Sequence, residues 1–538
     1  MYVHRPTKNV GDRTYQSVLL AESYREDRKV KRRTLANMTQ WPAEMVAGVE
    51  GLCKGGVVLK DDELVTGTGK CFGPLYVFKQ LADRHHLTEA LGDTRLARIA
   101  LLMIIATICQ PTSKVGLVKW AMNHAVNEIF GIEHLTLGDV YKACNWLSDN
   151  QEEIENRLFK LRGCKSGNYY LYDTTSTYFE GQKNELAAFG YNRDRKRGKR
   201  QVVYGMITDG DGFPITLTAF KGNTVDTAAF SAQTVDIAQR FKISKVAFVA
   251  DRGAMKSEQI AELKGTKDAT LYHVTALTKA QVRKLIKDGV LQLGLFDKEI
   301  QEIEHAGTRL VVRRNPVRAE EVRTDRQQRI AAAVTKIRAR ADKLKTSMRA
   351  IPMKAHNFAI VKIHQLKVES FVKIDLCDRE LTVTVDEEAV KEAEILDGCY
   401  VITTDIPASD ATAQEVHDRY KDLKYVEWAW QKIKTGHLEV RPIYLQKEQK
   451  TRGHIFMKML AYYLLRHFWI AVKDLPTLHD KVEEALWALE GIHTTCVMIK
   501  NVRIEMVPEL LSATQNLVLW GLGICLPKQR VLSAVGTT

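Results

Sequence analysis

A series of short apolar segments between residues 169 and 277 constrains the fold more than any other feature of the 538-residue sequence. Two of these segments alternate apolar and polar residues on either side of Asp209-Gly210-Asp211-Gly212, which is typical of a β-hairpin. Three antiparallel strands followed by alternating helices and strands predict a mixed α/β sheet. We expect strands at 169–172, 202–208, 213–220, 245–250 and 271–277, with helices at 227–239 and 257–263.

This order of elements is that of an RNase H-like core. The stretch 278–395 interrupts the order, with a long basic helix expected at 318–349 and strand-like segments at 358–363, 371–375 and 381–385. The core resumes with a strand at 399–404 and a helix at 412–434, which Thr412 and Glu415 begin as a capping box. The predicted fold is therefore α/β, an RNase H-like mixed-sheet core interrupted by an inserted subdomain. The expected divisions are a helical N-terminal region (1–160), the first part of the core (165–277), the inserted subdomain with its basic helix (278–395), the second part of the core (396–475) and a helical C-terminal region (476–538).

Composition excludes several classes of protein. With 45% hydrophobic and 27% charged residues, the chain has the balance of a folded globular protein and is not wholly disordered. The nine cysteines are scattered and form no CxxC pair, so a disulfide scaffold is excluded and a reducing compartment is indicated. Residues 1–33 are charged, and the longest uncharged apolar run, 99–109, is about half a membrane span. We therefore expect a cytoplasmic protein that is not bound to a membrane.

Basic residues are clustered, and the formal net charge is +14. The clusters lie at 25–33, 193–200 and 309–349, and the last holds thirteen basic and four acidic residues. One such cluster can be a solvated face. Three together favour contact with a phosphate backbone, in part through the N-terminal region and the 309–349 helix.

Asp173 and Asp251 each follow an apolar segment that is expected to be a strand. An aspartate in this position can simply end a strand or cap the next turn. Two such strand ends can also lie side by side in one sheet and present two carboxylates to one cation. Mg²⁺ prefers hard oxygen ligands, few of them from protein, and this pair would supply them.

A third acid lies on the helix expected at 412–434. Tyr420, Glu427 and Lys434 are spaced by seven residues, and helical geometry places Glu427 about 20° from Val416, inside the apolar stripe. A carboxylate directed into the protein needs a cation, a metal or a function. A buried Glu–Lys arrangement is the structural alternative. The stripe comprises Val416, Leu423, Val426, Trp430 and Ile433.

Several motifs, in order along the chain, resemble those of bacterial insertion-sequence transposases of the DDE class, in the branch with a tyrosine–arginine–glutamate–lysine signature. The resemblance covers about residues 168–275 and 395–470, and it is weaker at 31–37 (KRRTLAN). Tyr420, Glu427 and Lys434 match the last signature, but Leu423 stands where its arginine is expected. The matching segments are 171–180 (LYDTTSTYFE), 190–192 (GYN), 201–205 (QVVYG), 222–226 (GNTVD), 249–253 (VADRG), 438–442 (LEVRP) and 452–454 (RGH).

The resemblance implies a catalytic site of three acids, Asp173, Asp251 and Glu427, which hold two divalent metal ions. Mg²⁺ is the expected ion, with Mn²⁺ able to substitute, and the pair would activate a water or 3′-hydroxyl at one phosphodiester. The family cuts DNA at both ends of its own insertion sequence, the terminal inverted repeats, and joins the strands to target DNA. Two ends require two sites, so a homodimer on paired ends is expected. The residues expected to bind DNA are Tyr420, Lys434, Lys421, Lys424 and Arg252.

Two other functions remain open. A metal-dependent nuclease could use the same core without strand transfer, and a decayed transposase could bind element ends as a non-catalytic repressor. Some members of the family stabilise a DNA hairpin with an aromatic residue, and Trp428 or Trp430 could take this role, but Trp430 lies on the apolar stripe and is expected in the core, and neither is assigned to it. Asp226 is interpreted as a turn residue. Gly67-Thr-Gly-Lys70 lacks the first glycine and the Ser/Thr of a phosphate-binding loop.

Overall fold

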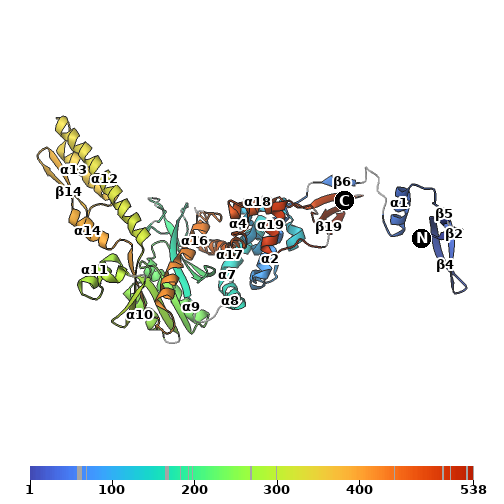
Figure 1. Ribbon diagram of the computed structural model, residues 1–538, viewed down its shortest axis with the longest axis horizontal. Helices are drawn as coiled ribbons and strands as arrows, with labels where there is room; N and C mark the ends of the chain where they lie inside the picture. Colours follow the sequence, from blue (N-terminus) through green and yellow to red (C-terminus); the bar gives the residue numbers. More distant parts are fainter. Residues whose placement is uncertain are drawn as a thin grey trace. The chain divides into compact units, whose positions relative to one another are not determined.

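The chain forms two compact units. The first comprises Met1–Phe72, Ile492–Leu511 and Cys525–Thr538, and the second comprises Gly73–Gly491 and Ser512–Ile524. Figure 1 shows their helices and strands. The computed structural model describes residues 1–11, 13–56, 64–67, 69–163, 169–181, 183–191, 193–194, 196, 198–266, 269–297, 300–434, 436–440, 443–499, 502–508, 510–528 and 531–536.

The first unit is mostly β-structure, so the expectation of a wholly helical N-terminal region is wrong for residues 2–37. The sequence did not reveal these strands because nearly every residue of β5 is exposed, which leaves no apolar periodicity. The C-terminal region likewise mixes strands with helices. The unit contains a sheet of order β1-β4-β5, a hairpin β2–β3, a sheet of order β19-β18-β17-β6, and one helix. Their bounds are β1 (Tyr2–His4), β2 (Thr7–Val10), β3 (Arg13–Gln16), β4 (Leu19–Glu26), β5 (Lys29–Asn37), α1 (Ala43–Cys53), β6 (Leu64–Gly67), β17 (Thr495–Ile499), β18 (Val502–Met506) and β19 (Val531–Gly536).

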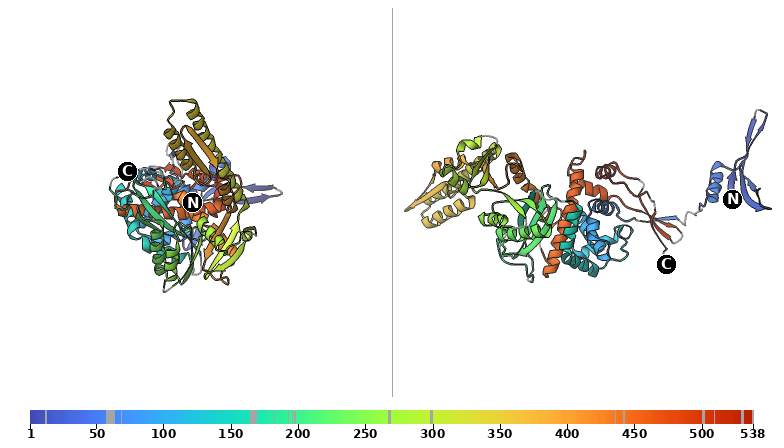
Figure 2. Two further views of the ribbon diagram at one scale, coloured as in Figure 1. Left: turned by 90° about the vertical axis from the view of Figure 1, so that its left-hand side faces the viewer. Right: turned by 90° about the horizontal axis from the view of Figure 1, so that it is seen from below.

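The second unit begins with a helical bundle, as the apolar spacing predicts. Its central element is α17, which packs against α4, α7 and strand β9; Figure 2 shows α17 in orange between the helices and the sheet. By length and composition α17 could cross a membrane, but 78% of its most apolar 18-residue stretch is buried within the protein, as in a core helix. The helices are α2 (Gly73–Arg84), α3 (Leu87–Leu91), α4 (Arg95–Cys109), α5 (Lys114–Met122), α6 (Val126–Phe130), α7 (Leu137–Asp149), α8 (Gln151–Leu161), α17 (Glu448–Val472), α18 (Lys481–Glu490) and α19 (Ala513–Leu522).

An eight-stranded mixed sheet forms the rest of the second unit, which confirms the predicted α/β class. Strands β7, β8 and β9 pair antiparallel, whereas β10 runs parallel to β7 and β11 runs parallel to β10. The order is β12-β13-β16-β11-β10-β7-β8-β9. Large aromatic side chains fill the core on one face, including Tyr172, Phe230 and Phe248. The bounds are β7 (Tyr169–Tyr178), β8 (Gln201–Asp209), β9 (Pro214–Lys221), α9 (Asp226–Arg240), β10 (Lys245–Ala250), α10 (Ser257–Lys264), β11 (Thr270–Ala276), β12 (Gln301–His305), β13 (Thr308–Arg314) and β16 (Cys399–Thr404).

Residues 278–395, which were expected to form one inserted subdomain, contribute to two separate parts of the fold. Its strands β12 and β13 extend the main sheet beside β16, after the short helix α11 (Lys279–Lys287). The remainder has its own apolar core. The long basic helix is confirmed as α12, but the strand predicted at 358–363 is wrong, because Ala355, Ala359 and Ile363 form a helical stripe. The elements of this part are α12 (Pro316–Thr346), α13 (Pro352–Leu366), β14 (Val372–Cys377), β15 (Glu380–Val385) and α14 (Glu387–Ile395).

Candidate active site

Asp173 and Asp251 lie on neighbouring strands at the same level of the sheet. Strands β7 and β10 are parallel, and their register pairs Tyr172 with Ala250. Asp173 and Asp251 are the next residues on each chain segment, so they follow that pair together. The expectation that the first strand ends at residue 172 is wrong, since β7 continues through Asp173 to Tyr178 and pairs with β8 along its whole length.

Asp173 is surrounded by protein. Burial raises the pKa of its carboxyl to about 7, although the guanidinium of Arg193 and a 2.8 Å hydrogen bond from the backbone N–H of Thr174 oppose this shift. The carboxylates of Asp251 and Glu427 raise the pKa further. Charges act on a pKa in this way at short range, so the three predicted acids share one electrostatic environment.

Glu427 is brought to this environment by a pair of helices rather than by one. The helix predicted at 412–434 begins at the expected capping box but breaks at Asp422 into α15 (Ala413–Lys421) and α16 (Leu423–Lys434). The expectation that Glu427 points into the apolar stripe is wrong, because its side chain is exposed although the residues of that stripe are buried. Within α16 helical geometry places Glu427 roughly 40° from Leu423, on the side away from Val426 and Ile433. The pocket walls still desolvate it partly and raise its pKa, and Asp251 raises it further.

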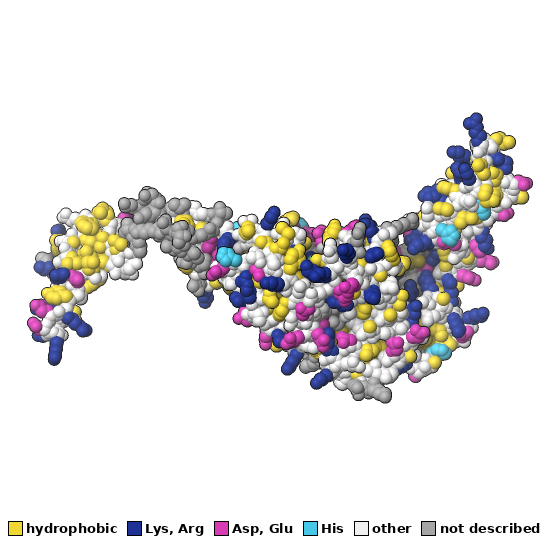
Figure 3. All heavy atoms as spheres, turned by 180° about the vertical axis from the view of Figure 1, so that it is seen from behind, with side chains coloured by type: hydrophobic (Ala, Val, Ile, Leu, Met, Phe, Trp, Pro, Cys, Tyr) yellow, Lys and Arg dark blue, Asp and Glu magenta, His cyan; other side chains and the backbone are white. Residues whose placement is uncertain are grey.

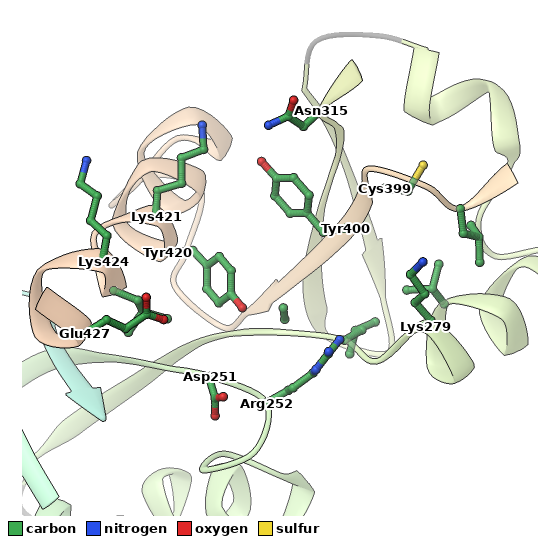
Figure 4. Close-up of a pocket in the computed structure, with 15 residues that line it drawn as sticks. Asp251, Arg252, Lys279, Asn315, Cys399, Tyr400, Tyr420, Lys421, Lys424 and Glu427 are labelled. Atoms are coloured by element: carbon green, nitrogen blue, oxygen red, sulfur yellow. The ribbon is translucent and has the colours of Figure 1, made fainter. Parts of the chain in front are cut away.

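A cavity of about 530 Å³ opens between these elements. Asp251, Glu427 and Tyr420 line it, and in Figure 4 the ring of Tyr420 points towards the loop that carries Asp251. Burial raises the pKa of Tyr420 to about 12, and Asp251 and Glu427 add to this effect. Four cationic side chains also line the cavity: Arg252, Lys279, Lys421 and Lys424. It therefore combines acids with cations suited to phosphate oxygens.

Asp251 also has the structural role that an aspartate after a strand commonly has. Its Oδ1 accepts hydrogen bonds from the backbone N–H groups of Gly253 at 2.7 Å and Ala254 at 3.0 Å. These bonds cap the turn that leads to α10. Both hydrogen bonds reach Oδ1 of Asp251, so Oδ2 of the same carboxylate takes no part in capping this turn.

Lys434 and Trp430 attach α16 to β7. Lys434 Nζ lies 3.1 Å from Thr175 Oγ1 and 2.9 Å from Asp194 Oδ1. The buried Trp430 directs its indole N–H to the backbone oxygen of Asp173 at 3.4 Å, as expected for a core residue. Neither side chain lines the cavity with Glu427. DNA contact by Lys434 therefore stays a prediction.

Leu423, in place of the signature arginine, is the first residue of α16 and is 8% exposed. It contributes an apolar part of the cavity wall, and the two cations that the sequence offered instead, Lys421 and Lys424, stand on either side of it. In Figure 4 both lysine side chains extend from the same pair of helices as Glu427. The cavity wall thus has two lysines, Lys421 and Lys424, beside the position where the signature has an arginine.

Sequence reasoning missed Asp226 and Arg193. Asp226, interpreted as a turn residue, begins α9, pairs with Arg193 at 2.6 Å and accepts a 2.8 Å hydrogen bond from the hydroxyl of Thr174. Arg193 is therefore held beside Asp173. The segment 222–226 ends at Asp226 and was a usable signal. No motif indicated Lys279, Asn315 and Tyr400, because they reach the cavity only through tertiary packing.

The donor set suits a hard divalent cation, although a preformed centre is not seen. In the part of the chain that the structure describes, no group of three or more His, Cys, Asp or Glu side chains is close enough to hold a metal ion. Burial raises the pKa of Asp173, the carboxylates of Asp251 and Glu427 raise it further, and carboxylate oxygens are the ligands that Mg²⁺ prefers. Asn192, Arg441 and Pro442 of the motifs lie outside the described residues.

Comparison with known proteins identifies the N-terminal segment. Residues 3–60 match the IS1634 family transposase, N-terminal domain. A structure of the piggyBac transposase synaptic complex with hairpin DNA aligns with this chain at 8% sequence identity, and the alignment covers 78% of this chain and 79% of the piggyBac chain. The TM-score of 0.36 is too low to support a conclusion from this similarity. No curated protein matches the chain. The N-terminal match confirms the resemblance to insertion-sequence transposases that the motifs of the sheet had indicated.

Proposed function

We propose that this protein is a DNA transposase of the DDE class, which cuts the ends of its own insertion sequence and transfers the strands to target DNA. The observation that carries the proposal is geometric: Asp173 and Asp251 directly follow paired residues of the adjacent parallel strands β7 and β10, and Glu427 of α16 lines one cavity with Asp251. The carboxylates of Asp251 and Glu427 also raise the pKa of Asp173. The N-terminal match supports the same family.

The order β9-β8-β7-β10-β11 supports an RNase H-like core. In this proposal β7 to β11 and their helices are the first part of the core, and β16 with α15 and α16 is the second part. The long insertion lies between them in sequence. In this division Glu427 belongs to the second part of the core, and its helix α16 packs against β7 of the first part.

The proposed mechanism assigns tasks to residues that lie in and beside the cavity. Asp173, Asp251 and Glu427 would hold two Mg²⁺ ions, or Mn²⁺ in their place. When bound, such ions activate a water or 3′-hydroxyl and stabilise the leaving oxygen. Arg252, Lys421 and Lys424 would hold DNA phosphates at the cavity, with Tyr420 beside the acids. Lys434 and Trp430 keep α16 against β7 and so orient Glu427.

DNA outside the cavity would contact the cationic surface of α12. Lys and Arg side chains gather along the arm formed by α12 and α13 in Figure 3. Arg318, Arg323 and Arg329 in its first half are ion-paired with acids on the same helix at 2.7 Å. Lys336, Arg338 and Lys343 in its second half are exposed, and the described residues place no carboxylate within ion-pair distance of them. The second half is thus the better phosphate surface.

Partners and location follow from the same proposal. Coordinated cutting of two terminal inverted repeats needs two active sites, so we expect a homodimer on paired DNA ends. The protein would act on bacterial DNA in the cytoplasm. A nuclease without strand transfer and a binding-only repressor remain the alternatives.

One experiment separates these functions. Purified wild type, Glu427→Gln and the matched control Glu392→Gln, which removes an exposed acid of α14, are incubated with Mg²⁺ and labelled DNA from the gene's own flanks. We expect wild type and the control to cut at the element ends and to join the cut ends to a plasmid, while Glu427→Gln only binds. Cutting without joining would support the nuclease. Binding without cutting by all three proteins would support the repressor.

A further inference from the structure

The first unit carries a protruding two-stranded ribbon. Strands β4 and β5 pair from Leu19 to Asn37, but β1 pairs only with the base of the ribbon, at residues 19–21. Residues 22–33 therefore have no third strand beside them in the described sheet. At the tip Asp27 and Arg28 both have positive φ, 49° and 63°, which is the backbone of a tight two-residue hairpin turn. Figure 2 shows the ribbon as a long hairpin in blue.

One side of the ribbon neutralises its own charge. Directly opposite residues share a face, and on this side the register pairs Glu22 with Arg33, Tyr24 with Lys31 and Glu26 with Lys29. Arg33 forms an ion pair with Glu22 at 2.8 Å, and Lys31 forms one with Glu26 at 2.7 Å. The guanidinium of Arg33 also lies 5.9 Å from the ring centre of Tyr24. We call this side the paired face: Glu22, Tyr24, Glu26, Lys29, Lys31 and Arg33.

The other side has cations but no acid. Here the register pairs Ser23 with Arg32 and Arg25 with Val30, and all four side chains are exposed. We call these residues the open face. Arg32 Nη1 lies 2.7 Å from His4 Nε2, and the described residues place no carboxylate within ion-pair distance of Arg25 or Arg32. An exposed ribbon does not need this unequal distribution of charge between its two faces for stability. The distribution therefore indicates that the open face binds a partner.

We propose that the open face enters the major groove of double-stranded DNA and recognises base edges there, a role that rests on the proposed transposase function. The major groove, about 12 Å wide, admits a two-stranded ribbon. Its base edges bind the groups that the open face presents. Arginine pairs with guanine through two hydrogen bonds, serine bonds to several bases, and an apolar side chain contacts the methyl group of thymine.

The paired face explains why the opposite orientation is excluded. Its cations already bind carboxylates of the same ribbon, and turning this face to the groove would direct Glu22 and Glu26 at the DNA. An acidic protein partner fits less well, because it would select for charge alone and not for the serine and valine between the arginines. The five residue pairs from 22 to 26 and 29 to 33 span roughly 15 Å, which corresponds to about four or five base pairs.

The test compares two pairs of substitutions in the full chain with Glu427→Gln, so that DNA is bound but not cut. The probe is a labelled duplex from the gene's flanks, and a random-sequence duplex gives the preference as a ratio of dissociation constants. Arg25→Lys with Arg32→Lys keeps the charge and removes the bidentate geometry. Lys29→Gln with Lys31→Gln removes two charges from the paired face as the matched control. Circular dichroism on heating checks that each variant is folded.

We expect the open-face arginine variant to lose preference by roughly 5- to 100-fold per contact while it keeps its affinity for random DNA. The paired-face control should bind both duplexes more weakly and keep the ratio. An unchanged ratio in the open-face variant, an equal loss in the control, or no preference in the parent chain would each overturn the inference.

Cleavage by the chain with Glu427 intact distinguishes the two proposals. If that chain cuts the ends in Mg²⁺ but the open face has no effect on preference, the ribbon inference fails and the transposase proposal stands. If preference depends on the open face but no cutting occurs, the ribbon inference stands and the enzymatic proposal fails.

Discussion

The main sheet and the β4–β5 ribbon are both β-structure, yet they hold charge in opposite ways. In the sheet, Asp173 is partly buried near two exposed acids, Asp251 and Glu427, and its pKa is raised to about 7. In the ribbon, every Lys and Arg is exposed, and the acids of one face are paired with their cross-strand neighbours. Carboxylates gathered where solvent is partly excluded are costly unless a cation joins them, whereas exposed ion pairs cost little. The candidate site therefore depends on tertiary packing, whereas the charge balance of the ribbon depends on pairing between neighbouring strands.

The largest expected difference between the two regions is in stability. Phe248→Ala removes a fully buried ring from the core under the sheet and should lower the free energy of unfolding by about 3–5 kcal/mol. Val30→Ala on the ribbon should change it by no more than about 0.5 kcal/mol, because Val30 is 68% exposed. Urea unfolding followed by circular dichroism measures both. Equal losses would show that the ribbon is packed in solution and would break the comparison.

Metal binding should stabilise only the sheet. If the acids hold Mg²⁺, adding the ion at about a hundred times its dissociation constant should stabilise the folded chain by about 2.7 kcal/mol. Asp173→Asn should abolish this gain, while Asp375→Asn on the exposed strand β14 should retain it. The readout is the thermal unfolding midpoint with and without Mg²⁺, independent of activity. An equal rise in wild type and Asp173→Asn would mean that the ion binds elsewhere.

The α12 surface should bind DNA without choosing its sequence. Changing Lys336, Arg338 and Lys343 to Gln should weaken binding to all duplexes and flatten the slope of log affinity against log salt by up to about 2.7. The ion-paired residues Arg318, Arg323 and Arg329 serve as the matched control and should change the slope less. Fluorescence anisotropy across a salt series gives both slopes. Equal slopes for the two variants would place the phosphate contacts elsewhere.

The smallest effect is expected on the paired face of the ribbon. Glu22→Gln removes the partner of Arg33, and its effect on stability should be within about 1 kcal/mol because this ion pair is exposed. Its main effect should be on DNA: the released guanidinium adds a sequence-independent cation, so affinity for both duplexes should rise and the preference ratio should stay the same. A titration with both duplexes measures this. A variant whose preference ratio changes would contradict the proposed orientation.

Prediction from sequence succeeded where a short segment carries its own signal. The hairpin at 209–212, the apolar strand before Asp251 and the capping box at Thr412 all follow from local rules and are seen. The ribbon was missed because residues exposed on both faces leave no apolar alternation, and the continuation of β7 was missed because Asp173 resembles a strand end.

The site was only partly predictable for a different reason. Spacing identified Glu427, but this residue lies at the edge of the buried face of α16, and spacing alone did not show that its side chain is exposed. Lys279, Asn315 and Tyr400 belong to elements that meet the acids only in three dimensions. Asp226 was misjudged because its partner Arg193 is distant in sequence and the two residues meet only in the folded chain.

The central claim is that Asp173, Asp251 and Glu427 act as one catalytic set, and cleavage of element-end DNA by three single variants tests it most directly. Asp173→Asn, Asp251→Asn and Glu427→Gln each remove one carboxylate with little change of shape. In Mg²⁺, each should cut at least about a hundredfold more slowly than wild type, because each loses a metal ligand, while binding to the same duplex is retained. Cutting at the wild-type rate by any one of the three folded variants would contradict the assignment.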